Sequence, residues 1–166
     1  MRAEAVRAII DGLKEAGVNF VGLMPDSEFR DVQEELRQDP HIKTISVSNE
    51  GTGVAVCAGA WLAGKVPALL IPTSGLLVAT WPLTSLCMAF GIPIILVIPY
   101  RGEIGDGHWV MRPYQFTTRP ALDMLQIPYS TVGHIDQVKE AIKATRRSAT
   151  GWLSPVGLLL TGEVIW

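Results

Sequence analysis

Residue types that bind metals or carry redox chemistry are scarce in this sequence. It has two cysteines and three histidines among 166 residues, and no group of them has the spacing of a metal site. Cys57 and Cys87 lie in apolar segments, where a buried free thiol is favoured over a redox or metal-binding role. We therefore expect no metal to be bound by this chain itself.

Charge is also scarce. Charged residues make up 18% of the chain, hydrophobic residues make up 48%, and the net charge is −2. So small a net charge gives no reason to expect a nucleic acid or an anionic membrane as a partner. Arg2, Glu4 and Arg7 interrupt the amino terminus, which has no signal-peptide core, so we expect a cytoplasmic protein. The chain is long enough for one domain, residues 1–166, and its apolar composition predicts a dimer or a larger hetero-oligomer.

The one long uncharged segment runs from Val66 to Tyr100. Its length is sufficient for a membrane span, but Pro67, Pro72, Pro82 and Pro93 interrupt it. We interpret it as a strand, a helix over about 76–89 and a second strand, buried on several sides. The helix is too apolar for a free surface, so we expect it to pack against another subunit through residues such as Leu83 and Met88.

Strand-like and helix-like segments alternate along the chain. Strands are expected over 20–24, 42–47, 68–71, 94–98, 129–132 and 156–160, and helices over 6–16, 29–36, 52–63, 76–89, 115–125 and 135–148. The segment 100–112 reads as irregular. This alternation predicts a parallel sheet of about six strands with helices on both faces, which is a three-layer α/β/α fold.

Glu50 stands out among the charged residues because of its surroundings. It follows the predicted strand 42–47 and precedes a helical segment rich in small residues. That position is the carboxyl edge of a parallel sheet, where α/β proteins bind their ligands. A lone carboxylate buried there is costly unless something pairs with it. The alternative is an ordinary acidic residue in the first helical turn, where the helix dipole favours it.

Several motifs in the sequence resemble one family of enzymes. N-E-G-T-G-V-A at 49–55 is similar to the cofactor-glutamate motif of thiamine-diphosphate enzymes, in the domain that binds the aminopyrimidine ring. The segments M-P-D-S at 24–27, T-S-G-L at 73–76 and P-Y-R-G-E at 99–103 resemble, in the same order and spacing, the α subunit of sulfopyruvate decarboxylase. They also resemble the N-terminal part of phosphonopyruvate decarboxylase. The resemblance covers roughly residues 5–161 and implies the thiamine-diphosphate-binding fold.

The resemblance implies that Glu50 activates the cofactor. In these enzymes a carboxylic group hydrogen-bonded to the N1′ atom of the ring favours the imino tautomer that removes the C2 proton. Gly51 would let the backbone approach the ring closely, and Thr73, Ser74 and Gly75 would border the cofactor. The family usually has N-S-G-L-G-N where this chain has T-S-G-L-L-V, and this departure leaves the substrate open.

Further polar residues follow two other predicted strands. By resemblance, Asp26 would relay a proton and Ser27 would bind the substrate carboxylate, whereas the alternative is that the pair caps the next helix. Arg101 and Glu103 are assigned to substrate binding, because a guanidinium there could hold a carboxylate, sulfonate or phosphonate. The alternative is a local Arg–Glu pair that holds the loop. His108 is a candidate to move protons, or a solvated loop histidine.

The motif for the cofactor's diphosphate is incomplete. In the family, Gly-Asp-Gly followed further along by Asn holds the diphosphate and Mg²⁺. This chain has G-D-G at 105–107, but its only asparagines are Asn19 and Asn49. We interpret the triplet as a flexible loop and the chain as half of an enzyme. Mg²⁺ and the diphosphate would be held mainly by a second polypeptide, a diphosphate-binding β subunit.

The leading hypothesis is therefore the α subunit of a split thiamine-diphosphate-dependent 2-oxo acid decarboxylase, inactive without its partner. Sulfopyruvate, giving sulfoacetaldehyde and CO₂, is the first candidate substrate, and phosphonopyruvate or another small 2-oxo acid is the alternative. A non-catalytic scaffold or regulatory relative stays open because Leu77 and Val78 depart from the family pattern. A nucleotide-binding module is disfavoured, since no Gly-x-Gly-x-x-Gly or phosphate loop follows a strand.

Overall fold

Six parallel strands form one sheet in the order β2-β1-β3-β4-β6-β5. The computed structural model describes all residues from Met1 to Trp166. The strands are β1 (Phe20–Leu23), β2 (Lys43–Ser46), β3 (Pro67–Leu70), β4 (Ile95–Pro99), β5 (Tyr129–Val132) and β6 (Val156–Leu160). The predicted parallel sheet is confirmed.

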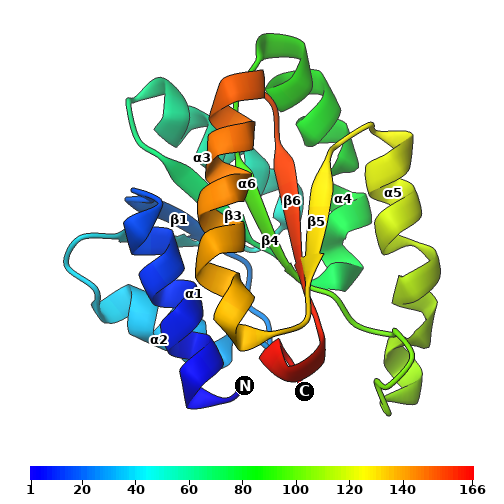
Figure 1. Cartoon of the computed structure of the whole chain (residues 1–166). Coiled ribbons are helices and arrows are strands. Elements are labelled where there is room, and N and C mark those ends of the chain that lie inside the picture. The colour runs from blue at the N-terminus through cyan, green and yellow to red at the C-terminus, as the bar shows by residue number, and fades with distance from the viewer.

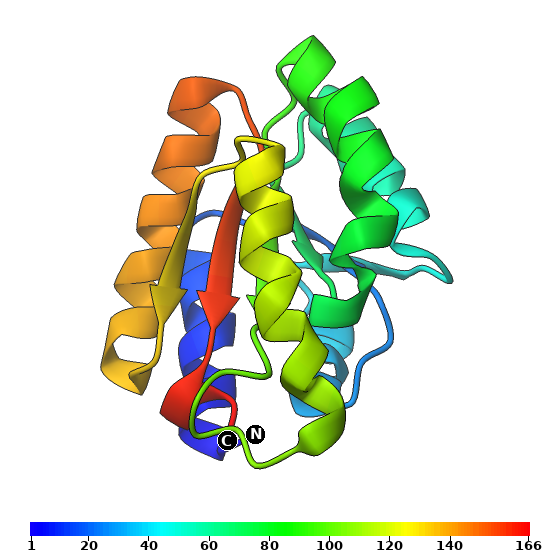
Figure 2. The same cartoon turned by 90° about the vertical axis from the view of Figure 1, so that its right-hand side faces the viewer.

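Helices cover both faces of this sheet, so the predicted three-layer fold is also confirmed (Figures 1 and 2). One outer layer contains α1 (Ala3–Glu15), α2 (Arg30–Gln38) and α6 (Val138–Trp152). The other contains α3 (Glu50–Leu62), α4 (Leu76–Pro82) and α5 (Thr118–Met124). None of these helices combines the length and the apolar composition that a membrane crossing requires.

Each face of the sheet has its own hydrophobic core. Leu70 and Val97 belong to a cluster of 24 buried residues on the side of α1, α2 and α6. Leu69 and Leu96 belong to a cluster of 20 buried residues on the side of α3, α4 and α5. Successive side chains of a strand point to opposite faces, so a strand covered on both sides must be apolar throughout. This requirement explains the uninterrupted apolar sequences of β3, β4 and β6.

The predicted helix over 76–89 is present but not regular. It is α-helical to Pro82 and continues as a π turn, Leu83–Met88. Proline has no N–H to donate to the preceding turn, and π turns, although rare, occur mostly as single turns inside α-helices. Leu83 is completely buried in the chain's own core, so its predicted place on a subunit contact is wrong. Met88 is half-buried.

The predicted irregular segment 100–112 is shorter than expected. A 3₁₀ helix, Trp109–Phe116, precedes α5, so residues 109–112 are helical rather than irregular. Two further short turns, Ile135–Gln137 and Gly162–Val164, follow β5 and β6.

Candidate active site

The loops that follow the strands meet at one edge of the sheet, where both chain termini also lie (Figures 1 and 2). Asp26 follows β1, Glu50 follows β2, Thr73 follows β3 and Arg101 follows β4. The chain runs from β1 to β2 on one side and then crosses back to β3 on the other side of β1, so the direction in which strands are added reverses there. Such a switch point leaves a crevice at the carboxyl edge, which is the usual ligand site of an open α/β sheet.

Glu50 is the first residue of α3 and is only 8% exposed. The side chain of Asn49, not that of Glu50, caps this helix, because Asn49 Oδ1 accepts the Thr52 N–H at 3.2 Å. The Glu50 carboxylate makes no hydrogen bond or ion pair within the chain. Carboxylates are rarely buried without a partner, because burial removes water that the charge would otherwise bind. Glu50 is therefore a largely buried residue whose carboxylate has no partner in the chain and keeps some contact with solvent.

Gly75 lies directly against the Glu50 carboxyl group. A Cβ on residue 75 would overlap Cγ, Cδ and Oε1 of Glu50. The φ angle of Gly75 is −91°, which any residue adopts, so glycine is needed here for space rather than for backbone conformation. The turn Thr73–Gly75, which follows β3, is thus in direct contact with the start of α3, which follows β2. Gly51 is also predicted to approach the cofactor, and a Cβ added there would meet Asn49 and Pro82 first.

A pocket of about 60 Å³ lies at the ends of β1, β3 and β4, and its lining includes Thr73 and Ser74, which precede Gly75 in the same turn, but not Glu50 or Gly75. It brings together five of the predicted residues, Asp26, Ser27, Thr73, Ser74 and Arg101. The Thr73 hydroxyl donates to the backbone oxygen of Pro99, which ties the loop after β3 to the end of β4. Ser27 and Ser74 are exposed, and their hydroxyl groups have no partner in the chain.

Asp26 serves as a cap in this structure. Its Oδ1 accepts the N–H groups of Glu28 at 2.7 Å and Phe29 at 3.1 Å, just before α2 begins. Partial burial raises the pKa of Asp26, although these two hydrogen bonds and Arg101 act in the opposite direction. Capping and proton transfer are compatible. A carboxyl group with a raised pKa stays protonated up to a pH nearer to neutral, so it can still donate a proton there.

Arg101 is almost fully buried, and each of its guanidinium nitrogens faces a carboxylate. Its Nε and Nη2 donate to the two oxygens of Asp106 at 2.7 and 2.9 Å, and its Nη1 donates to Glu28. Asp106 also accepts the N–H groups of Gly102 at 2.9 Å and His108 at 3.1 Å. The adjacent guanidinium holds the pKa of Asp106 well below its usual range, and Asp106 in turn raises the pKa of Arg101.

This network changes two expectations about the loop after β4. The local pair that holds the loop joins Arg101 to Asp106, not to Glu103. The Gly-Asp-Gly triplet lies in a loop, as predicted, but its aspartate is an anchor with four hydrogen bonds rather than part of a free loop. Because these bonds engage both Asp106 oxygens, Asp106 is not presented as a ligand for Mg²⁺.

Glu103 and His108 are not brought to the pocket. Glu103 pairs with Arg119 at 2.8 Å and accepts the Thr161 hydroxyl at 2.8 Å, on the side of β6. His108 is exposed, and only its backbone N–H takes part in the loop network. Sequence reasoning missed Glu28, which lines the pocket and binds Arg101. Its place directly after the M-P-D-S motif was the available signal.

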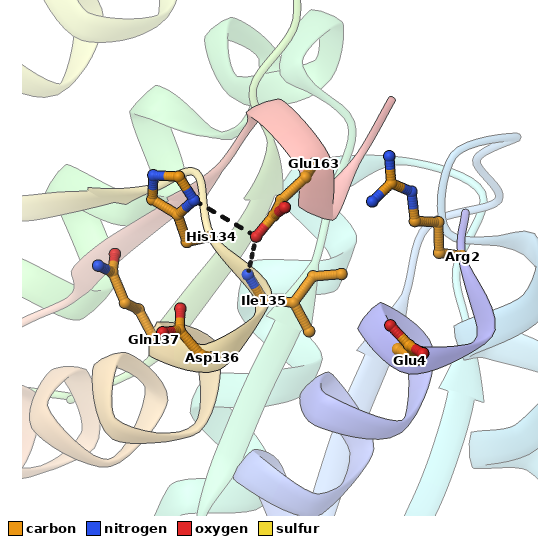
Figure 3. A pocket seen from close by; sticks show the side chains of 7 residues that line it. All are labelled: Arg2, Glu4, His134, Ile135, Asp136, Gln137 and Glu163. Atoms are coloured by element: carbon orange, nitrogen blue, oxygen red, sulfur yellow. Dashed lines mark hydrogen bonds and ion pairs between the residues drawn. The ribbon is translucent and has the colours of Figure 1, made fainter.

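The largest hollow on the surface lies elsewhere. It measures about 640 Å³ and lies between the start of α1 and the loops after β5 and β6 (Figure 3). There Glu163 accepts the Ile135 N–H at 2.8 Å and lies 3.4 Å from Nδ1 of His134. None of the predicted site residues lines this hollow, so its size does not make it the candidate active site.

Comparison with known proteins finds relatives that are all 2-oxo acid decarboxylases or their subunits. The chain is 31% identical over 156 residues to the sulfopyruvate decarboxylase α subunit of Methanococcus maripaludis, covering 94% of this chain and 93% of that protein. It is 33% identical to the corresponding subunit of Methanothermobacter thermautotrophicus, covering 86% of each. Phosphonopyruvate decarboxylase of Streptomyces viridochromogenes is 31% identical, covering 95% of this chain but 40% of that protein.

A solved structure supports the fold independently. The 2-oxoglutarate:ferredoxin oxidoreductase of Magnetococcus marinus, solved with 2-oxoglutarate, coenzyme A and succinyl-CoA, matches the whole chain with a TM-score of 0.71. That match covers 30% of the neighbour's chain at 17% identity, so it bears on the fold alone. No protein-family model matches the sequence. On the identity and coverage of its relatives, the chain belongs to the family of sulfopyruvate decarboxylase α subunits.

Proposed function

We propose that this chain is the cytoplasmic, pyrimidine-binding half of a two-chain thiamine-diphosphate decarboxylase. Its proposed substrate is a small 2-oxo acid with a second acidic group, with sulfopyruvate as the first candidate. The observation that carries the proposal is the side chain of the largely buried residue Glu50, whose carboxylate has no partner in the chain and lies against Gly75 at the carboxyl edge of the sheet. A ring nitrogen of the cofactor is a partner of the required kind.

The residues around Glu50 fit this role. When bound, thiamine diphosphate supplies the nucleophilic carbon and takes up the electrons that departing CO₂ leaves behind. Glu50 would hold a proton against a ring nitrogen of the cofactor, and Gly75 leaves the space that this carboxyl group occupies. Replacing a carboxylate by hydrogen also requires a proton donor, and Asp26, whose pKa is raised by burial, lines the adjacent pocket.

A second chain is needed for the cofactor's diphosphate and Mg²⁺. Two of the relatives are named as α subunits, and Asp106, the aspartate of the only Gly-Asp-Gly, is fully engaged with Arg101 and backbone N–H groups. The face of α3 and α4 also leaves several large apolar side chains exposed, namely Leu62, Leu77, Val78 and Trp81. Exposed apolar side chains of this kind on α4 and at the end of α3 are suited to contact with a partner subunit.

Phosphonopyruvate is the second candidate substrate, because phosphonopyruvate decarboxylase is similar over nearly the whole chain. Both candidates are 2-oxo acids with a second, strongly acidic group. A non-catalytic relative of the same fold remains a further alternative, supported only by Leu77 and Val78, which replace the family's glycine and asparagine and project from α4. The buried Glu50 argues against it.

Reconstitution tests the proposal. The chain would be purified alone, mixed with a diphosphate-binding subunit from the same organism, and supplied with thiamine diphosphate and Mg²⁺. We expect sulfopyruvate decarboxylation only in the mixture. Substantial cofactor-dependent decarboxylation by the chain alone would contradict the division of labour. A mixture that forms a complex but decarboxylates no 2-oxo acid would instead favour the non-catalytic alternative.

A further inference from the structure

The two carboxylates that hold Arg101 differ in how firmly they are fixed. The Asp106 side chain is 2% exposed, and both of its oxygens bind Arg101 as well as backbone N–H groups. The Glu28 side chain is 22% exposed and uses one oxygen on Nη1 of Arg101. Asp106 is therefore a permanent part of the loop, whereas Glu28 is attached to Arg101 by one contact.

Glu28 can leave this contact without disturbing the backbone. Its own N–H is bound by Asp26 at 2.7 Å, which fixes the main chain independently of the Glu28 side chain. A change of rotamer is enough to carry its carboxylate away from Arg101 toward solvent. The Nη1 position then opens to the pocket, beside the unpartnered hydroxyl groups of Ser27 and Ser74.

The charge of the pocket makes Glu28 an obstacle to an acidic ligand. Arg101 is the only base among the residues that line it, while Asp26 and Glu28 line it and Asp106 lies against the guanidinium. An entering anion therefore meets more carboxylates than cations. Anions near like charges are disfavoured, and only a group that binds Arg101 strongly can replace Glu28 there.

We propose that Glu28 is an internal counter-ion of Arg101 that the second acidic group of the substrate displaces. The carboxylate fills the anion position when the pocket is empty and selects for substrates with a sulfonate or phosphonate, because a neutral tail cannot replace it. This inference rests on the proposed function for the identity of the substrate. The replacement of the Glu28 carboxylate by an anion at Arg101 requires only that anion and the contacts described above.

The test uses sulfoacetate, which carries a sulfonate and a carboxylate but has no keto group to react. Its binding would be measured by calorimetry on the full chain and on the complex with the partner subunit. Glu28→Gln should bind sulfoacetate about three- to tenfold more tightly than wild type, since one competing partly exposed ion pair is removed. Glu35→Gln is the control, because it makes an equal charge change at an exposed position of α2, and it should bind sulfoacetate as wild type does. On an Arg101→Gln background, Glu28→Gln should have no effect.

Activity gives a second readout. In the active complex, Glu28→Gln should lower the KM for sulfopyruvate and leave the KM for pyruvate unchanged. Unchanged or weaker sulfoacetate binding by Glu28→Gln, in both the chain and the complex, would overturn the proposal, as would the absence of any binding. If the complex decarboxylates no 2-oxo acid, the proposed function fails, while the sulfoacetate titration still decides the role of Glu28.

Discussion

The carboxyl group of Glu50 occupies the space that a side chain on Gly75 would fill. The two residues are the start of α3 and the end of the turn after β3, so the contact joins two crossovers of the sheet. Any substitution that adds a Cβ at position 75 must move the carboxylate.

Gly75→Ala should therefore leave a folded chain that binds the cofactor poorly. Loss of one hydrogen bond to a charged group predicts thiamine diphosphate binding about ten- to a hundredfold weaker in the complex. Gly151→Ala is the control, because an added Cβ at this position of α6 meets no atom within 4 Å. Cofactor affinity would be measured by calorimetry. Wild-type affinity in Gly75→Ala would show that the Glu50 position is not important for binding.

Two substitutions separate the capping role of Asp26 from its proposed role in proton transfer. Asn retains an oxygen that accepts the Glu28 and Phe29 N–H groups, so Asp26→Asn should change the free energy of unfolding by less than about 0.5 kcal/mol. Its turnover in the complex should fall about a hundredfold or more, because the acid is lost. Asp26→Ala should also lose about 1 kcal/mol of stability with the cap. Full turnover in Asp26→Asn would leave Asp26 with a capping role only.

Asp106 should stabilise the fold in a pH-dependent manner. Its pKa in the folded chain lies below the usual value of 3.8, so the ionised form is favoured by folding. The stabilisation is complete above about pH 4 and is lost as the pH falls toward the folded pKa. Asp106→Asn should therefore lower the free energy of unfolding at neutral pH by about 2 kcal/mol.

Denaturant titrations between pH 7 and pH 3 would measure this effect, with Asp136→Asn, at an exposed position, as the control. The difference between wild type and Asp106→Asn should shrink as the solution is acidified. A difference that is constant over this range would mean that the carboxylate charge is unimportant.

The apolar face of α3 and α4 predicts where the partner binds. Trp81 is 75% exposed, so Trp81→Glu should leave the fold stable and weaken association with the partner subunit. Leu83→Glu should unfold the chain instead, because Leu83 is buried in the core. Trp152→Glu, on α6 in the opposite layer, should change neither property. Sedimentation and thermal melting would separate these outcomes, and normal assembly of Trp81→Glu would place the interface elsewhere.

The sheet was predictable because its strands are buried on both faces. Runs such as Ile95–Ile98 have no polar interruption, and the helices between them show their own spacing. The orientation of α4 was not predictable in the same way. Its sequence is apolar nearly all round, so it does not reveal that Trp81 faces solvent while Leu83 faces the core. Pro82 and the π turn after it also alter which side chains share a face.

The candidate site was predictable in its parts but not in its contacts. Each strand end showed polar residues, and a parallel sheet brings strand ends to one edge, so Glu50 and Asp26 were placed correctly at that edge. The pairing of Arg101 depends on the path of an irregular loop, which folds Asp106 back and leaves Glu103 to Arg119. No periodicity encodes such a path.

The central claim is that Glu50 activates the cofactor in an assembly with a diphosphate-binding subunit. Exchange of the C2 proton of bound thiamine diphosphate with deuterium, followed by nuclear magnetic resonance after acid quench, measures this activation directly. The wild-type complex should exchange rapidly, and Glu50→Gln should exchange about a hundredfold or more slowly while the cofactor stays bound and the fold is intact. An exchange rate in Glu50→Gln equal to that of wild type would contradict the account and leave Glu50 as a residue that only begins a helix.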